Sequence, residues 1–119
     1  MKGRLIMVQM IRMTITIGFN DKDTKFQLYP DRFYYNKIDE LLKLNTINAA
    51  TLVKCEGYYK GQKENSIQVI LLLNIENEKY QSISDEDTKN IHNFIKGIKG
   101  DFNQDCVMIE RQVINCNFV

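Results

Sequence analysis

The sequence lacks the ligand pattern of a zinc site. Its three cysteines, Cys55, Cys106 and Cys116, form no CxxC pair, and its one histidine is His92. A structural zinc site takes four Cys or His ligands arranged at short spacings, and this chain has too few of them at suitable spacing. The odd number and wide spacing of the cysteines indicate reduced thiols in a cytoplasmic protein rather than a disulfide framework.

A strong excess of one charge is also absent. Sixteen basic and 15 acidic residues leave a formal net charge of +1, whereas proteins that bind nucleic acid or an anionic membrane usually carry a marked basic excess. We therefore expect neither partner. The apolar run from Leu5 to Val8 is interrupted by Gln9 and Arg12, too soon for a signal peptide or a membrane span. The expected location is the cytoplasm.

What is present is the composition of one globular domain. The 119 residues are 44% hydrophobic, enough to form a packed core. From Ile11 to Phe19 the odd positions are apolar and the even ones are mostly polar, which predicts a half-buried strand. We expect residues 1–12 to be an N-terminal extension and residues 13–119 to be the domain.

Two helices are predicted from apolar residues at helical spacing. The first covers about 31–44, with Pro30 at its start and Tyr34, Ile38, Leu41 and Leu42 on one face. The second begins after the N-cap Ser84, and its apolar stripe is Ile91, Phe94, Ile95, Ile98 and Phe102. Gly100 is predicted to be the residue that ends it.

Three more strands complete the pattern. "ATLVKCEGYY" and "SIQVILLLNI" predict an antiparallel hairpin that turns after Gly61, with a possible bulge at Gly57. The last strand starts near Val107, and its parity changes after Gln112, as a bulge or a tail would cause. The order indicates an α+β fold, the ferredoxin-like βαββαβ plait, with a four-stranded antiparallel sheet and two helices on one face.

No motif for catalysis, a metal or a cofactor is found. The loop "NDKDTK" has Asp21 and Asp23, but it lacks the glycine and glutamate of a calcium loop. Its aspartates are typical of a solvated turn. Glycine-rich phosphate loops and nucleophile elbows are missing, and the hairpin strand "SIQVILLLNI" has no aromatic on which to stack RNA bases.

The helix-free face of the predicted sheet is the first candidate binding surface. We expect Val53 beneath the helices, and we expect an apolar centre on the other face with a polar rim that includes Lys54, Glu56 and Gln68. An uncovered apolar face favours protein contact, with a second copy of the chain or with a host protein. The alternative is that residues 5–10 or 114–118 cover it. The candidate partner-binding residues are Leu52, Ile70, Leu72, Met108 and Glu110.

A ligand pocket is the second hypothesis. It would lie near the 20–25 loop and the "GYYKG" turn at 57–61, and would make the chain a small-ligand-binding protein or a small enzyme. Its polar lining would be Asp21, Asp23, Lys25, Tyr58, Tyr59 and Arg111.

Four segments carry a resemblance to known proteins. "TITIGFNDKDTK", "GYYKGQKENSIQVILLL" and "FNQDCVMI" resemble small proteins of uncharacterised function from phages and other mobile elements of Gram-positive bacteria. The spacing of these segments, together with "VINCNF", also resembles a broader bacterial domain family of unknown function. The resemblance implies a small cytosolic protein that acts in a host cell, as a modulator of a host or defence component. We therefore expect a non-enzymatic binding protein, with ligand binding or a small enzyme as the alternative.

Overall fold

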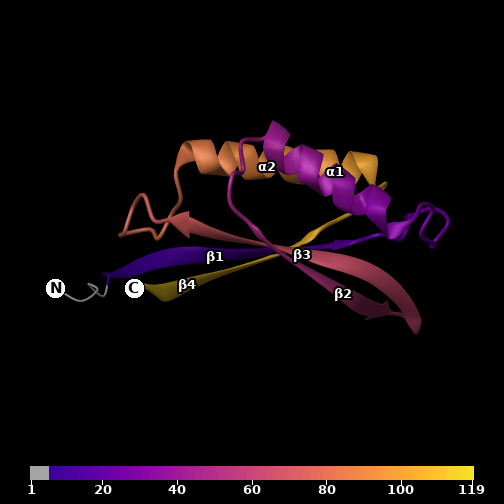
Figure 1. Ribbon diagram of the computed structural model, residues 1–119, viewed down its shortest axis with the longest axis horizontal. Helices are drawn as coiled ribbons and strands as arrows, with labels where there is room; N and C mark the ends of the chain where they lie inside the picture. The colour runs from indigo at the N-terminus through magenta and orange to yellow at the C-terminus, as the bar shows by residue number, and fades with distance from the viewer. Residues whose placement is uncertain (1–5) are drawn as a thin grey trace.

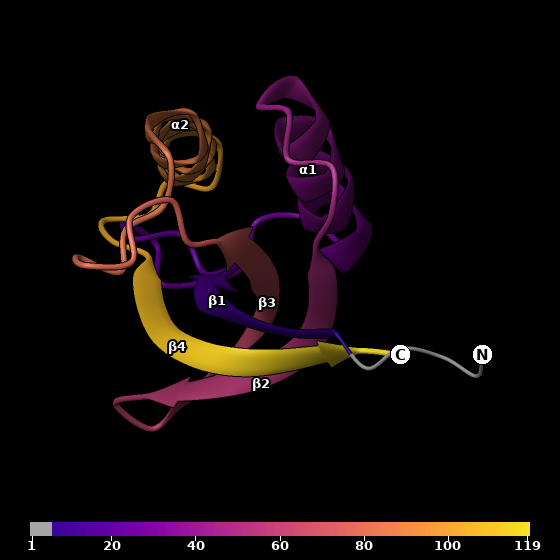
Figure 2. The same ribbon diagram turned by 90° about the vertical axis from the view of Figure 1, so that its left-hand side faces the viewer.

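The computed structural model describes residues 6–119, without the side chains of Ile6 and Tyr59. Its elements are β1 (Ile6–Gly18), α1 (Asp31–Leu44), β2 (Thr51–Tyr59), β3 (Gln62–Asn74), α2 (Asp85–Asp101) and β4 (Met108–Phe118). The strands form one antiparallel sheet in the order β2-β3-β1-β4. Both helices lie on the same side of this twisted sheet (Figures 1 and 2). The predicted βαββαβ plait is confirmed.

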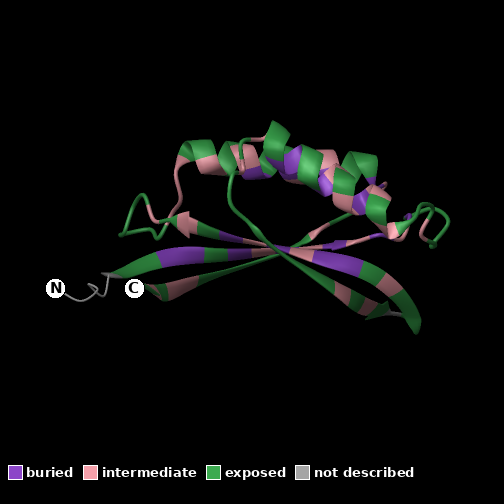
Figure 3. Cartoon of the chain, in the orientation of Figure 1, coloured by how far each residue is buried: buried purple, intermediate pink, exposed green. Residues whose placement is uncertain are grey.

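The two central strands supply most of the sheet's share of the core. On β1 the odd positions Ile11, Ile15 and Ile17 are fully buried under the helices, as are Val69 and Leu71 on β3. Buried segments accordingly alternate with exposed ones along the ribbon (Figure 3). Each fully buried aliphatic side chain stabilises the fold by about 1.5–3 kcal/mol, so these two strands hold the helices in place.

The helices form where their apolar stripes predict. α1 has the predicted bounds, and Tyr34, Ile38, Leu41 and Leu42 are buried. The hydroxyl oxygen of the α2 N-cap, Ser84, accepts a hydrogen bond from the backbone N–H of Asp87 at 3.0 Å. No helix in the described part of the chain is long and apolar enough to cross a bilayer.

The strands are longer and more regular than predicted. β1 begins at Ile6, so residues 6–12 belong to the sheet rather than to an extension. They pair in continuous register with residues 112–118 of β4. Neither the bulge nor the tail expected after Gln112 is therefore present, and no bulge occurs at Gly57, where β2 and β3 also pair without interruption.

Two chain reversals also differ from the prediction. The hairpin turns on two residues, Lys60 and Gly61, and both have positive φ, as a type I′ turn requires. Gly100 lies inside the last turn of α2 rather than after it. Asn103 takes the left-handed conformation there, with φ of 50°, because asparagine tolerates that region better than most residues.

An aromatic cluster joins the end of β1 to both helices. The Phe19 ring stacks on Tyr34 of α1 with 4.4 Å between the ring centroids, and meets Phe102, after α2, edge-on at 6.1 Å. The Tyr34 hydroxyl oxygen accepts hydrogen bonds from the backbone N–H groups of Leu28 and Tyr29, both at 3.3 Å. Phe19 thus fixes where the chain leaves the sheet.

Truncating this ring tests the cluster. Phe19→Ala should lower the free energy of unfolding by about 3–5 kcal/mol, because it leaves a cavity between the sheet and both helices. Urea titration followed by circular dichroism measures the loss. In the matched control, Phe26→Ala, the ring removed is 65% exposed, and the change should stay within about 0.5 kcal/mol. Equal losses in the two variants would contradict the proposed role.

Candidate functional site

The sheet face opposite the helices has nothing above it in the described part of the chain. Directly opposed residues of antiparallel strands point to the same face, so the strand pairing determines its members. We call it the open face, and its central members are Arg12, Thr14, Thr16, Val53, Gln68, Ile70, Leu72, Met108, Glu110 and Gln112. Neither residues 6–10 nor residues 114–118 fold over it, because they extend β1 and β4.

The pairing confirms most of the predicted face and corrects β2. Ile70 and Glu110 both lie opposite Thr14, Leu72 lies opposite Arg12, and Met108 lies opposite Thr16. Leu52, however, pairs with the buried Val69 and so belongs to the helix side, whereas Val53 pairs with Gln68 on the open face.

The rest of β2 follows the same correction. The ammonium of Lys54 lies 4.4 Å from the centre of the Tyr35 ring on α1, so Lys54 also faces the helices. Glu56 shares its parity. Neither residue belongs to the polar rim predicted for the open face.

The centre of the open face is polar rather than apolar. Gln68 pairs with Thr16 across the two middle strands, and its Nε2 donates to the Thr16 hydroxyl at 3.4 Å. A shallow cavity of about 530 Å³ lies beside this pair, within the size range of small-molecule sites. It is lined by Arg12, Thr14, Gln68, Glu110, Arg111 and Gln112.

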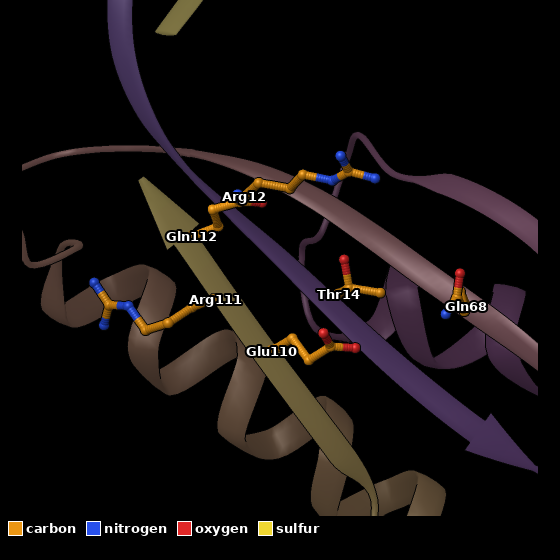
Figure 4. Close-up of a pocket in the computed structure, with 6 residues that line it drawn as sticks. All are labelled: Arg12, Thr14, Gln68, Glu110, Arg111 and Gln112. Atoms are coloured by element: carbon orange, nitrogen blue, oxygen red, sulfur yellow. The ribbon is translucent and has the colours of Figure 1, made fainter. Parts of the chain in front are cut away.

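The cavity brings together a cation and an anion that have no ion-pair partner among the described residues. The Arg12 guanidinium and the Glu110 carboxylate both lie on the open face (Figure 4). Arg111 extends away from the others, and its guanidinium donates to the backbone carbonyl of Gln81 in the loop before α2. The hollow can therefore receive a ligand that carries both charges, with hydrogen-bonding groups from Thr14, Gln68 and Gln112 beside them.

Asp21, a predicted ligand residue, is engaged within its own loop. It exposes 6% of its surface, and its carboxylate accepts hydrogen bonds from the backbone N–H groups of Thr24 at 2.8 Å and Asp23 at 3.0 Å. The side-chain amide of Asn103, after α2, donates to it at 2.6 Å. This carboxylate fastens the 20–25 loop to the end of α2.

Of the other residues of the predicted pocket, Arg111 lines the cavity of the open face, whereas Asp23, Lys25 and Tyr58 do not. Asp23 accepts from the Asn103 amide at 2.9 Å, and the Lys25 ammonium donates to the carbonyl of Lys22. Tyr58 is 70% exposed, and the Tyr59 side chain lies outside the described residues. The β2–β3 turn does reach the 20–25 loop, since the Gln62 amide donates to the carbonyl of Lys25 at 2.9 Å.

A carboxylate that the sequence analysis passed over lies at this junction. Glu64 of β3 accepts a hydrogen bond from the backbone N–H of Asn20 at 2.8 Å. It lies over Gly18, where a Cβ would come within 2.4 Å of the carboxylate. Glycine at this point leaves the room that Glu64 occupies.

Four cavity residues, Arg12, Thr14, Gln68 and Gln112, were not among the predicted partner-binding or ligand-binding residues, and Glu110 was predicted to bind a partner rather than a ligand. Arg12 was assigned to an extension, although it continues the alternation of β1. The alternation along the strands is the signal that could have found these residues, because the even positions of β1 and β4 carry most of the polar side chains of the open face.

Other reactive groups do not gather. No three His, Cys, Asp or Glu side chains among residues 6–119 are placed to hold a metal ion. Cys106 is exposed in the loop before β4, and Cys55 and Cys116 are half-buried. His92 borders a second hollow of about 340 Å³ between α2 and β4, whose lining includes Met13, Ile95 and Ile109.

The loop carboxylate should make stability depend on pH. The hydrogen bonds from Thr24 and Asn103 hold the pKa of Asp21 below its ordinary value of 3.8. A depressed pKa stabilises the fold at pH values above 3.8, and this contribution is lost as pH falls through the folded-state pKa. Asp21→Asn should therefore lower the Tm at pH 7, and the gap to the unmodified protein should narrow toward pH 3.

The matched control for this experiment is Asp39→Asn. That change removes an exposed i,i+4 pair with Lys43, 3.0 Å long, which contributes only a few tenths of a kcal/mol. Scanning calorimetry at several pH values measures both variants. A Tm gap for Asp21→Asn that is equal at pH 7 and pH 3 would rule out the carboxylate as its cause.

Among known proteins, similarity to this chain is found only with solved structures. No family model matches the chain, and no curated protein matches it. A phage SAM lyase in complex with S-methyl-5′-thioadenosine is similar with a TM-score of 0.63 and 23% identity, over 99% of this chain and 96% of that one. A phage SAM lyase in the apo state gives 0.58 and 22%, over 91% and 87%.

A third solved structure is more distant. It is the apo form of CPII, a nitrogen regulatory PII-like protein from Thiomonas intermedia K12, with a TM-score of 0.51, 10% identity and coverage of 98% and 100%. At these identities the likeness establishes a shared fold. The chain therefore has a ferredoxin-like fold that it shares, over nearly its whole length, with phage SAM lyase and a PII-like protein.

Proposed function

We propose that this chain binds S-adenosylmethionine (SAM) in the cavity of the open face and cleaves it to S-methyl-5′-thioadenosine. The supporting observation is the near-complete overlap with a phage SAM lyase solved with that nucleoside, together with a cavity that presents Arg12 and Glu110 without ion-pair partners. The proposal therefore adopts the alternative hypothesis of the sequence analysis, a ligand-binding protein or small enzyme, in place of a non-enzymatic protein that binds other proteins.

The charges of the cavity match those of the ligand. SAM carries a positive sulfonium, a positive ammonium and a carboxylate. The Glu110 carboxylate would attract the cationic groups, and the Arg12 guanidinium would hold the ligand carboxylate in a bidentate pair. The amides of Gln68 and Gln112 and the hydroxyl of Thr14 would donate to and accept from the nucleoside. These side chains come from β1, β3 and β4, a rigid platform for positioning a ligand.

The reaction balances without water, metal or reductant. S-methyl-5′-thioadenosine keeps the methyl group, sulfur and adenosine of SAM, so the bond that breaks joins sulfur to the Cγ of the amino-acid chain. The electron pair goes to sulfur, which becomes a neutral thioether. The four-carbon fragment then either closes its own carboxylate oxygen onto Cγ, as a lactone, or loses a Cβ proton to a base and leaves as an alkene. Holding the chain in one conformation is the main requirement for either route.

Loss of SAM would also fit a role in a host cell. Methyl-transfer enzymes depend on this donor, so a small protein that consumes it would modulate them without contacting them. Such an activity agrees with the phage or mobile-element context that the resemblance implies. The host protein partner expected from the sequence stays a prediction.

Product analysis tests the activity. The purified chain incubated with SAM should release S-methyl-5′-thioadenosine, detected by liquid chromatography and mass spectrometry, together with a lactone or an unsaturated amino acid. Titration calorimetry with S-methyl-5′-thioadenosine measures binding separately. The absence of both product and binding at millimolar ligand would overturn the proposal. Binding without product formation would indicate a protein that sequesters the ligand and would rule out the lyase activity.

Matched carboxylate variants locate the site. Glu110→Gln should weaken SAM binding by about tenfold or more, because a charged hydrogen-bond partner contributes about 1.5–3 kcal/mol. Glu56→Gln removes a carboxylate from the helix side of the same sheet and should bind normally. Glu64→Gln tests the junction of the 20–25 loop and the β2–β3 turn. If Glu64→Gln loses SAM binding while Glu110→Gln binds SAM normally, the site lies at that junction instead of in the cavity.

A further inference from the structure

A second hollow lies on the helix side of the sheet, between α2 and the edge strand β4, and we call it the α2–β4 hollow. Its volume is about 340 Å³, at the small end of the range for ligand sites. Ile109 shows that this space is not filled by the core. It pairs with the fully buried Ile15 and so faces the helices, yet 46% of its surface is exposed. α2 therefore leaves part of β4 uncovered.

The lining of this hollow combines an apolar surface with a few polar groups. One face of α2 contributes residues at helical spacing, and the rest come from β1, β4 and the loop before α2. The apolar members are Met13, Ile83, Ile91, Ile95 and Ile109, and the polar members are Ser82, Thr88, His92 and Arg111. Neither an aspartate nor a glutamate is among these lining residues of the described chain. The hollow therefore offers apolar contact together with positive charge and hydrogen-bond donors.

Arg111 supplies the positive charge. It pairs with Met13, whose side chain is buried under the helices, so its own side chain starts on the helix side as well. Its guanidinium donates to the carbonyl of Gln81 and has no ion-pair partner among the described residues. This bond uses only part of the guanidinium, whose remaining N–H groups can donate to a ligand. A carboxylate matches their planar fork geometry.

The loop that forms one wall of the α2–β4 hollow is held by its own hydrogen bonds. The backbone carbonyl of Ser82 accepts from the N–H groups of Glu76 at 2.8 Å and Asn77 at 3.3 Å, and its N–H donates to the carbonyl of Asn77 at 3.1 Å. The bond from Arg111 to Gln81 joins the same loop to β4. The hollow is therefore formed before a ligand arrives, as is usual for small-molecule sites.

We propose that the α2–β4 hollow binds a small carboxylic acid with an apolar body. The carboxylate pairs with the guanidinium of Arg111, and the hydroxyl of Thr88 and the imidazole of His92 offer further hydrogen bonds. The apolar body lies against Ile95 and Ile109, where it removes exposed apolar surface from water.

The same charges separate this site from the proposed SAM cavity. SAM and free amino acids carry cationic groups, for which the lining of the α2–β4 hollow has no acidic partner. Burying such a group without a partner is costly, so these ligands are disfavoured here. The inference therefore does not depend on the proposed SAM cleavage.

Titration with octanoate, followed by NMR of isoleucine methyl groups in the full chain, tests the proposal. The methyl signals of Ile95 and Ile109 should shift and saturate at millimolar octanoate, whereas Ile70 on the open face should not move. Octanol and octylamine have the same apolar chain without the negative charge. Both should bind more weakly by about tenfold or more, because they lose the charged hydrogen bonds to Arg111.

Two pairs of variants locate the ligand. Arg111→Gln should weaken octanoate binding by about tenfold or more, and Arg111→Lys, which keeps the charge, should lose less. Thr88→Phe places a ring in the hollow from an exposed position of α2 and should abolish octanoate binding. Its matched control is Asn93→Phe, at an exposed position of α2 outside the lining, which should bind octanoate normally.

Several results would contradict the proposal: no saturable shift, shifts centred on Ile70, or octanol or octylamine binding as tightly as octanoate. Equal octanoate binding by Thr88→Phe and Asn93→Phe would contradict it as well. Binding of S-methyl-5′-thioadenosine by Thr88→Phe should equal that of the unmodified chain. This measurement separates a failure at the α2–β4 hollow from a failure of the proposed function.

Discussion

The strict alternation of side chains along β1 and β3 is the constraint on which the rest of the structure depends. Because successive side chains of a strand point to opposite faces, the odd positions of both strands send Ile11, Ile15, Ile17, Val69 and Leu71 into one core. Two amphipathic helices are enough to cover that side. The even positions are left on the other side with nothing above them in the described residues, and the cavity results from this one-sided core.

Elements with strong local signals were predictable from the sequence. α1 and the cap of α2 match because their apolar stripes and the Ser84 side chain act within a few residues. The face of β2 was predicted wrongly because Leu52 and Val53 are both apolar, so alternation alone does not say which of them points inward. Only pairing with β3 decides it, and a shift of one residue moves a whole strand's side chains to the other face.

The cavity was much harder to predict than the fold. Arg12, Gln68 and Glu110 lie on three strands and are far apart in the sequence, and only the strand pairing brings them together. The predicted loop residues drew attention because their charges are consecutive in the sequence. Asp21 instead satisfies local backbone N–H groups and the amide of Asn103, as aspartates in turns commonly do. The consecutive charges of the 20–25 loop therefore make a structural contact. The cavity is formed instead by polar residues that are far apart in the sequence and point to the same face of the sheet.

A crystal structure of the chain with S-methyl-5′-thioadenosine tests the central claim most directly. This claim is that the open face of the sheet is the ligand-binding surface. The account predicts nucleoside density on the open face, within hydrogen-bond distance of Gln68 or Gln112 and close to Arg12 or Glu110. Density on the helix side, for instance in the hollow between α2 and β4 beside His92, would contradict it.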